Sequence, residues 1–150
     1  MNTENTESEN QIEEKPQYPC LCALIRKVGR SLTRKYGDSL KSSGLKVTQY
    51  SLLANIIRNP NVTVSDLAGL LVMDQSTLTR NLQVLVKMGY VYLEPDMTDN
   101  RIKKIHVSDN GISKMDEARP LWEKIQLEME QNLGAQNVER IIANLARMVE

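Results

Sequence analysis

The spacing of apolar residues along this chain changes from a helical repeat to a strand repeat and then back again. Apolar residues recur every three or four positions from about residue 19 to 89, and again after residue 108, as in amphipathic helices. Between these stretches, residues 90–94 and 101–107 are rich in β-branched and aromatic residues and flank a turn-forming segment, 95–100. This pattern predicts a β-hairpin inserted in a helical chain.

Capping and helix-breaking residues divide the helical stretches. They predict a long helix that ends at Gly134 and a final helix to Val149, preceded by four earlier helices, residues 19–40, 49–58, 64–72 and 74–88. Four of these helices follow a residue that suits an N-cap: Thr48, Thr63, Asp74 and Ser108. Asp66 completes a box-like cap with Thr63, and Val62 is expected to add one short strand. Pro120 predicts a bend in the long helix.

The helix predicted after Asp74 combines an apolar stripe with a polar beginning. Leu78, Leu82 and Leu85 recur at helical spacing on one side. The first two turns carry compact or forked hydrogen-bonding side chains: Gln75, Ser76, Thr77, Thr79 and Arg80. A helix that enters the major groove of DNA needs such groups, because short donors and acceptors reach base edges and an Arg grips guanine or phosphate. A capped surface helix without a partner has the same pattern, so the flanking segments decide between the two interpretations.

The segments on either side favour DNA recognition. The helix at 64–72 is joined to the next one by a short connection at Met73-Asp74, as in a helix-turn-helix motif, although a generic helical hairpin has the same form. The β-hairpin follows directly, in the place of a wing. Its tip carries Arg101, which suits a narrow, electronegative minor groove, and Asp99 is the expected positioning partner. Lys103 and Lys104 are candidate phosphate contacts, and solvated lysines are the alternative.

The sequence therefore predicts a mainly α fold with a small β-hairpin wing (α+β), in three parts. Residues 1–17 form a disordered acidic arm, residues 45–108 a winged helix-turn-helix DNA-binding domain, and residues 18–44 with 109–150 a helical dimerisation region. The end segments carry more apolar surface than a small winged domain can cover. A two-fold homodimer would cover it, and would place two reading helices about 34 Å apart on a palindromic site. The alternative is a helical pack closed within one chain.

Charge is distributed unevenly along the chain. The 150 residues have a net charge of +0, but residues 1–14 hold five acids and no base. The remainder therefore carries nineteen bases against fourteen acids, a body charge of +5 that suits a nucleic-acid partner. Neither an apolar run of membrane-spanning length nor a signal peptide occurs, so a cytoplasmic location is expected.

Short motifs occur in a fixed order along the chain: Gly44-Leu45, Thr48-Gln49-Tyr50, Leu67-Ala68, Asp74 to Arg80, Gly89-Tyr90-Val91, Asp99-Asn100-Arg101, Ser108-x-x-Gly111 and Ala118-x-x-Leu121-Trp122. Their order, spacing and chemistry resemble the MarR family of bacterial winged-helix regulators, from about residue 20 to the C-terminus. The resemblance implies an obligate homodimer, mostly a repressor, that binds double-stranded DNA at a palindromic operator. It also implies release of DNA when a small phenolic or other aromatic effector binds between the dimer helices and the winged domain, or when a cysteine is oxidised.

The resemblance also implies roles for individual residues. On the reading helix, the groove and phosphate contacts would be Gln75, Ser76, Thr77, Thr79 and Arg80. On the wing, Arg101 would enter the minor groove beside Asp99, with Lys103 and Lys104 as phosphate contacts.

Two cysteines, Cys20 and Cys22, raise the alternative of a redox-sensing regulator. Cys22 resembles the reactive cysteine of the peroxide-sensing branch of the family, and Tyr36 has the spacing of one of its tyrosine partners. Arg26 and Val47 stand where the other partners would be expected, although a cation one turn after Cys22 can lower a thiol pKa. Packing of the cysteine on an apolar helix is the competing interpretation.

No cofactor, metal site or catalytic site is expected. The Cys20-Leu21-Cys22 pair offers a soft metal two ligands, which do not complete a site, and His106 is far away in sequence. His106 is expected to be a strand residue with its hydrogen bonds satisfied. The sequence lacks a Gly-rich phosphate loop, a zinc-ligand cluster and a nucleophile with a base partner, so an enzyme is not predicted. A winged module that docks on another protein through its hairpin remains a further alternative; its binding would depend little on salt.

Overall fold

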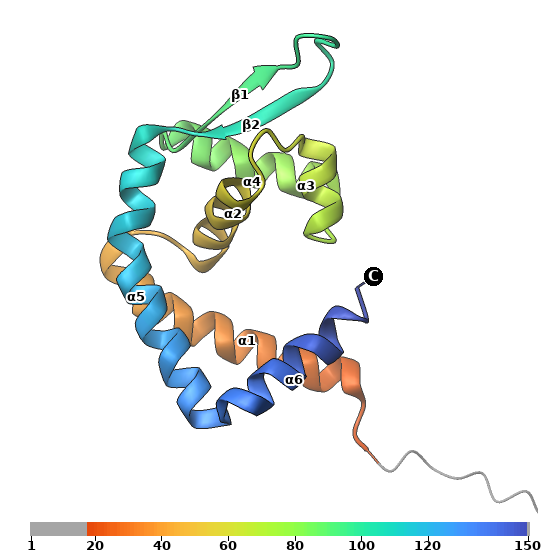
Figure 1. Cartoon of the computed structure of the whole chain (residues 1–150), viewed down its shortest axis with the longest axis vertical. Helices are drawn as coiled ribbons and strands as arrows, with labels where there is room; N and C mark the ends of the chain where they lie inside the picture. The colour runs from red at the N-terminus through yellow and green to blue at the C-terminus, as the bar shows by residue number, and fades with distance from the viewer. Residues whose placement is uncertain (1–17, 150) are drawn as a thin grey trace, which may run out of the picture.

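The computed structural model describes residues 18–149, which form six α-helices, one 3-10 helix and a two-stranded antiparallel sheet. In chain order these are α1 (Leu21–Leu40), η1 (Lys41–Ser43), α2 (Val47–Arg58), α3 (Val64–Leu70), α4 (Gln75–Lys87), β1 (Val91–Pro95), β2 (Lys103–Val107), α5 (Asp109–Leu133) and α6 (Ala135–Ala146) (Figure 1). This is the mainly α fold with a hairpin that the sequence predicts. The acidic arm predicted at 1–17 lies outside the described residues.

The hydrophobic core lies mainly in residues 45–108, which we call the winged-helix unit. Helices α2, α3 and α4 gather under the hairpin, and α5 leads from the hairpin along α1 toward α6 (Figure 1). Seven large side chains are less than 2% exposed: Leu40, Leu53, Leu67, Leu78, Leu82, Leu85 and Ile105. The beginning of α5 joins this core through Met115 and Ala118. One packed body therefore holds α4 and the hairpin in a fixed relation.

The hairpin is tied to the start of α3 as well as to itself. β1 and β2 pair from Val91 opposite Val107 to Pro95 opposite Lys103. The short strand expected at Val62 is reduced to one isolated bridge, which pairs Thr63 with Lys104; the Ile105 N–H donates to the Val62 carbonyl at 3.0 Å beside it. The second strand begins at Lys103 rather than at residue 101, because Asp96 N–H bonds the Ile102 carbonyl at 2.8 Å and closes the tip as a turn.

Most of the predicted helix caps are correct, whereas several helix ends differ by one to three residues; α6, for example, ends at Ala146 rather than at Val149. The side chains of Thr63, Asp74 and Ser108 each accept a backbone N–H from the first turn, as predicted. Thr48 is not a cap: α2 begins at Val47, because Gln49 Oε1 accepts from the Lys46 N–H at 2.8 Å. α3 ends at Leu70 rather than at residue 72, because Val72 adopts a left-handed backbone conformation, with a φ of 50°.

Helices α1, α5 and α6, which we call the end helices, leave much apolar surface uncovered. No residue of α6 is buried, and in α1 Leu40 is the buried one. Apolar side chains of these two helices and of the residues after α6 are 37–68% exposed: Leu21, Leu24, Ile25, Val28, Leu32, Ile141, Ile142, Leu145, Met148 and Val149. These helices do not form the closed pack that was the alternative to a dimer. None of the helices between residues 18 and 149 has the length and apolarity that crossing a membrane requires.

A tight backbone contact joins the end of β2 to α5. Pro120 lies inside α5 without ending it, whereas the start of the helix is set by Ser108. Ser108 Oγ donates to the Gly89 carbonyl at 2.6 Å and accepts from the Gly111 N–H at 3.1 Å. A Cβ added at Gly111 would lie 2.2 Å from the Tyr90 carbonyl oxygen and 2.7 Å from Val107 Cγ1. The Ser108-x-x-Gly111 motif thus lets α5 pass directly against the turn that precedes the wing.

We predict that Gly111→Ala destabilises the protein by about 1–3 kcal/mol, because a methyl group would overlap backbone that cannot move away. Denaturant unfolding followed by circular dichroism measures this loss. Gly69→Ala is the matched control, since no atom lies within 4 Å of the added Cβ and the helix gains propensity. Equal stability of the two variants would contradict the contact.

Candidate nucleic-acid interface

Burial of one leucine stripe determines which face of α4 meets solvent. Leu78, Leu82 and Leu85 are at most 1% exposed and lie in the core. The turn before α4 is closed by the Met73 N–H, which donates to the Ala68 carbonyl at 2.9 Å, so α3 and α4 form a helix-turn-helix. The predicted reading residues therefore lie on the uncovered side of α4. Four of them are exposed and Thr77 is half-buried.

Asp74 organises the first turn of α4. Its carboxylate accepts from Ser76 Oγ at 2.6 Å, from the Thr77 N–H at 2.8 Å and from Thr77 Oγ1 at 2.7 Å. These hydrogen bonds hold the pKa of Asp74 well below its usual range, with the Ser76 bond first among the causes. Asp74 is thus more than a cap, since it also fixes two of the predicted reading side chains.

The other polar residues of α4 are held to different degrees. Gln75 Nε2 donates to Ser65 Oγ on α3 at 3.0 Å, a contact that the sequence did not reveal. Arg80 folds back along its helix, with Nε 3.3 Å from the Ser76 carbonyl and Nη2 3.4 Å from Ser76 Oγ. Thr79 is exposed.

Arg101 extends from the tip of the wing. Its side chain is 95% exposed, and Nε lies 3.9 Å from Asp99 Oδ1. The firmer contact of Asp99 is with the Arg101 backbone N–H, at 2.9 Å. Asp99 therefore positions the backbone of Arg101, while the guanidinium is left able to reach a partner.

The two wing lysines differ in their surroundings. Lys103 is exposed, whereas Lys104 forms an ion pair with Asp96, which the sequence analysis did not single out. Asp96 Oδ1 also accepts from the Thr98 N–H at 2.8 Å, and the Lys104 and Thr98 bonds lower the pKa of Asp96. The Asp-x-Thr spacing, typical of a side-chain-closed turn, was the signal for Asp96. Its pairing with Lys104 depends on the register of the hairpin.

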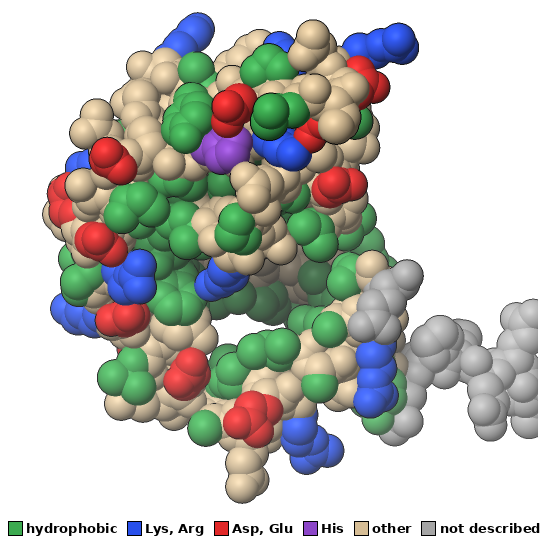
Figure 2. Space-filling view, turned by 45° about the horizontal axis from the view of Figure 1, so that its top comes forward, with side chains coloured by type: hydrophobic (Ala, Val, Ile, Leu, Met, Phe, Trp, Pro, Cys, Tyr) green, Lys and Arg blue, Asp and Glu red, His purple; other side chains and the backbone are tan. Residues whose placement is uncertain are grey.

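One groove brings α3, α4 and the wing together. Its volume is about 500 Å³. The start of α3 and Gln75 of α4 line one side of it, and residues 101–103 of the wing line the other. Gln75, Arg101 and Lys103, which are far apart in sequence, thus line one surface. Figure 2 shows basic side chains along the upper edge of the molecule. A groove of this kind, with donors from a helix on one side and cations from a hairpin on the other, is suited to a nucleic-acid backbone.

His106 lies in β2, as expected, but its hydrogen bonds are not satisfied within residues 18–149. Its ring stacks on Tyr92 with centroids 5.1 Å apart. Its buried Nε2 makes no hydrogen bond there and lies 3.3 Å from Glu94 Oε2. The expectation of a satisfied strand histidine was wrong in this respect.

The fold and this surface define a winged helix-turn-helix protein, and comparisons identify its family. A model described as MarR family matches residues 43–102. The M. tuberculosis transcriptional regulator MosR, crystallised with DNA, is 36% identical; the match covers 87% of this chain and 96% of MosR, with a TM-score of 0.77. The regulator SarZ of Staphylococcus epidermidis is 31% identical over 91 residues, 61% of this chain and 62% of SarZ. The chain belongs to the MarR family of transcriptional regulators.

Other proteins are similar to this chain in fold alone, or match it over only part of their length. A mutant of E. coli MarR complexed with operator DNA has a TM-score of 0.79 over 87% of this chain and 94% of MarR, and at 24% identity it shows likeness in fold alone. The chain spans less than two thirds of the first curated relatives that it matches, 65%, 63% and 62% of their lengths. Membership of a family of regulators confirms the prediction that the chain is not an enzyme.

Proposed function

We propose that this regulator binds double-stranded DNA as a homodimer at a palindromic operator and represses transcription there. The observation that carries the proposal is the groove that joins Gln75 of α4 to Arg101 and Lys103 of the wing. The polar face of α4 would read bases in the major groove, and Arg101 would enter the adjacent minor groove. The structures of MosR and of the MarR mutant, both of which contain DNA, support this assignment. Such a protein would act on DNA in the cytoplasm.

The uncovered faces of the end helices support the homodimer. Exposed apolar side chains lie along α1 and α6. In Figure 2, hydrophobic side chains border the gap that separates the lowest part of the molecule from the rest. Burying them against the same faces of a second copy would remove them from water through a self-complementary interface. We therefore assign residues 18–44 and 109–150 to dimerisation and residues 45–108 to DNA binding.

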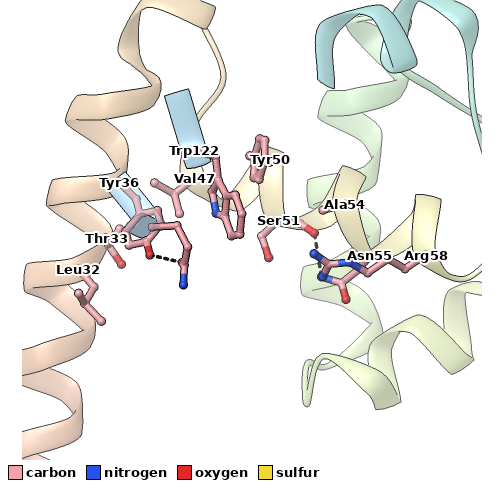
Figure 3. A pocket seen from close by; sticks show the side chains of 11 residues that line it. Leu32, Thr33, Tyr36, Val47, Tyr50, Ser51, Ala54, Asn55, Arg58 and Trp122 are labelled. Carbon is pink, nitrogen blue, oxygen red and sulfur yellow. Dashed lines mark hydrogen bonds between the residues drawn. The ribbon is translucent and has the colours of Figure 1, made fainter. Parts of the chain in front are cut away.

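A cavity beside α2 is suited to the small aromatic effector. It has a volume of about 320 Å³ and is lined by residues of α1, α2 and α5 (Figure 3). Tyr50 and Trp122 stack in its wall with ring centroids 5.9 Å apart, and the Tyr36 hydroxyl donates to Gln126 Oε1 at 2.6 Å. Burial, followed by the charge of Glu130, raises the pKa of Tyr36, so this phenol remains a neutral donor at pH 7. The cavity thus offers aromatic faces and a hydroxyl to a phenolic ligand.

A second candidate for the signal is oxidation of Cys22. Both Cys20 and Cys22 are exposed at the start of α1, which leaves the thiols accessible to an oxidant. Tyr36 does not contact Cys22 of its own chain, because fourteen residues of helix separate them by about 21 Å. A contact between them would need the second copy in the dimer.

For the dimer, we predict that Ile142→Glu raises the dissociation constant at least about thirtyfold, since it places a carboxylate in the proposed apolar interface. Sedimentation of the native chain is expected to show a species of two chains. Ala143→Glu adds the same charge about 100° around α6 from Ile142, outside the apolar stripe, and should leave that species intact. A native chain that sediments as a single copy would exclude the homodimer.

For DNA binding, we predict that Arg101→Ala weakens binding to a selected palindromic duplex about tenfold while the dimer persists. The affinity of the native chain should also fall steeply with added salt, as expected for release of phosphate counterions. Fluorescence anisotropy at several salt concentrations measures both effects. Arg119→Ala, on α5, removes the same side chain and should keep native affinity. Salt-insensitive binding would favour the protein-docking alternative.

For the effector, we predict that a phenol such as 4-hydroxybenzoate changes the fluorescence of Trp122, the single tryptophan of the chain, and releases the DNA. Tyr36→Phe should weaken both responses several-fold, about the value of one hydrogen bond, whereas Tyr92→Phe on the wing should change neither.

If instead peroxide releases DNA from the native chain but not from Cys22→Ser, the signal is redox. If the phenol neither binds to the protein nor causes it to release DNA, this cavity is excluded as the effector site.

A further inference from the structure

Three hydrogen bonds at the start of α4 have a defined direction. An ionised carboxylate accepts hydrogen bonds and cannot donate them. Ser76 Oγ and Thr77 Oγ1 lie 2.6 Å and 2.7 Å from the oxygens of Asp74, so each hydroxyl directs its single proton at the carboxylate. The lone pairs of Ser76 and Thr77 are left to face other partners.

We propose that Asp74 determines sequence preference by holding Thr77 and Ser76 as hydrogen-bond acceptors, so that they receive amino groups of bases and do not donate to phosphate. This inference rests on the proposed DNA-binding function. In the major groove, adenine N6 and cytosine N4 carry amino donors, whereas guanine O6 and thymine O4 are acceptors. An acceptor held opposite O6 or O4 would meet another lone pair, which is unfavourable. Asp74 is thus a positioning residue that acts through the hydroxyls.

Two further observations support this arrangement. The pKa of Asp74 is held well below its usual range, so the carboxylate stays ionised at any pH at which the protein would bind DNA. Arg80 Nη2 lies 3.4 Å from Ser76 Oγ and can donate to it, which is compatible with a hydroxyl proton that already points at Asp74. Because Arg80 occupies one lone pair of Ser76 Oγ, Thr77 Oγ1 is the acceptor that is more available to a base.

The geometry identifies the variant that reverses the direction of one bond. Asp74 Oδ1 accepts from the Thr77 N–H, whereas Oδ2 accepts from Thr77 Oγ1. In Asp74→Asn, the remaining oxygen can keep the backbone bond, and Asn is as good an N-cap as Asp. The amide nitrogen then takes the place of Oδ2 and donates to Thr77 Oγ1. The Thr77 proton is released and can be donated to a base.

The test is selection of bound sequences from a pool of randomised duplexes at fixed salt. The native chain is expected to enrich cytosine or adenine at one position of each half-site. Asp74→Asn should shift that position toward guanine or thymine by about tenfold, the discrimination expected of a short hydrogen-bonded contact. Circular dichroism should show unchanged helix content.

Asp66→Asn is the control for charge. Asp66 is exposed on α3, lines the groove described above and makes its side-chain bond to Thr63, at 2.8 Å. Removing its charge should raise affinity for all duplexes alike and leave the base preference unchanged. If Asp74→Asn does the same and no more, Asp74 acts by charge alone and the proposal is wrong.

Thr77→Val supplies an independent measurement. It removes the hydroxyl at nearly constant shape, so the preference at that position should disappear, and adding Asp74→Asn in this background should then change nothing further. An effect of Asp74→Asn that persists without the Thr77 hydroxyl would overturn the proposal. A native chain that enriches no sequence would contradict the proposed function itself, and the inference would fall with it.

Discussion

Burial of the α4 leucine stripe is the constraint on which the recognition surface depends. Leu78, Leu82 and Leu85 occupy fully enclosed positions, and successive residues of a helix point about 100° apart. If α4 turned by one residue, polar side chains would enter the core without hydrogen-bond partners, at a cost of several kcal/mol. The core therefore sets which side chains of α4 face outward. The polar residues need no packing of their own in order to be presented together.

Elements determined by local chemistry were predictable from the sequence, and those determined by register were not. The caps at Thr63, Asp74 and Ser108 were recognised because each bonds a backbone N–H three residues later. The start of α2 was misplaced, because Lys46 is not a capping residue and Gln49 reaches back to it. The ion pair of Lys104 with Asp96 and the bond from Gln75 to Ser65 join different elements. These two contacts could be identified only once the hairpin register and the packing of α3 on α4 were known.

The proposed effector cavity lies where the winged-helix unit meets the end helices. Its walls belong to α1 and α5 on one side and to α2 on the other. A ligand bound there contacts both parts at once, and it can shift their relative arrangement by as much as its affinity differs between two arrangements. Because α2 packs in the same core as α4, a change at the cavity would be carried to the reading helices as a change in their spacing within a dimer. A dimer binds a palindromic site only when the distance between its two reading helices matches the distance between the half-sites.

Carboxylates beside a DNA-binding surface oppose the approach of phosphate, yet this surface contains several of them. Asp74, Asp96 and Asp99 each accept hydrogen bonds from groups that the proposed complex would use or that hold such groups in place. The repulsion acts on every duplex alike and is screened by salt, whereas the order imposed on a hydroxyl or a turn favours some base sequences over others. A body charge of +5 outside the first fourteen residues compensates for the uniform loss. Affinity can therefore be supplied by charges distributed over the surface, while the carboxylates act on specificity, which only short-range geometry can provide.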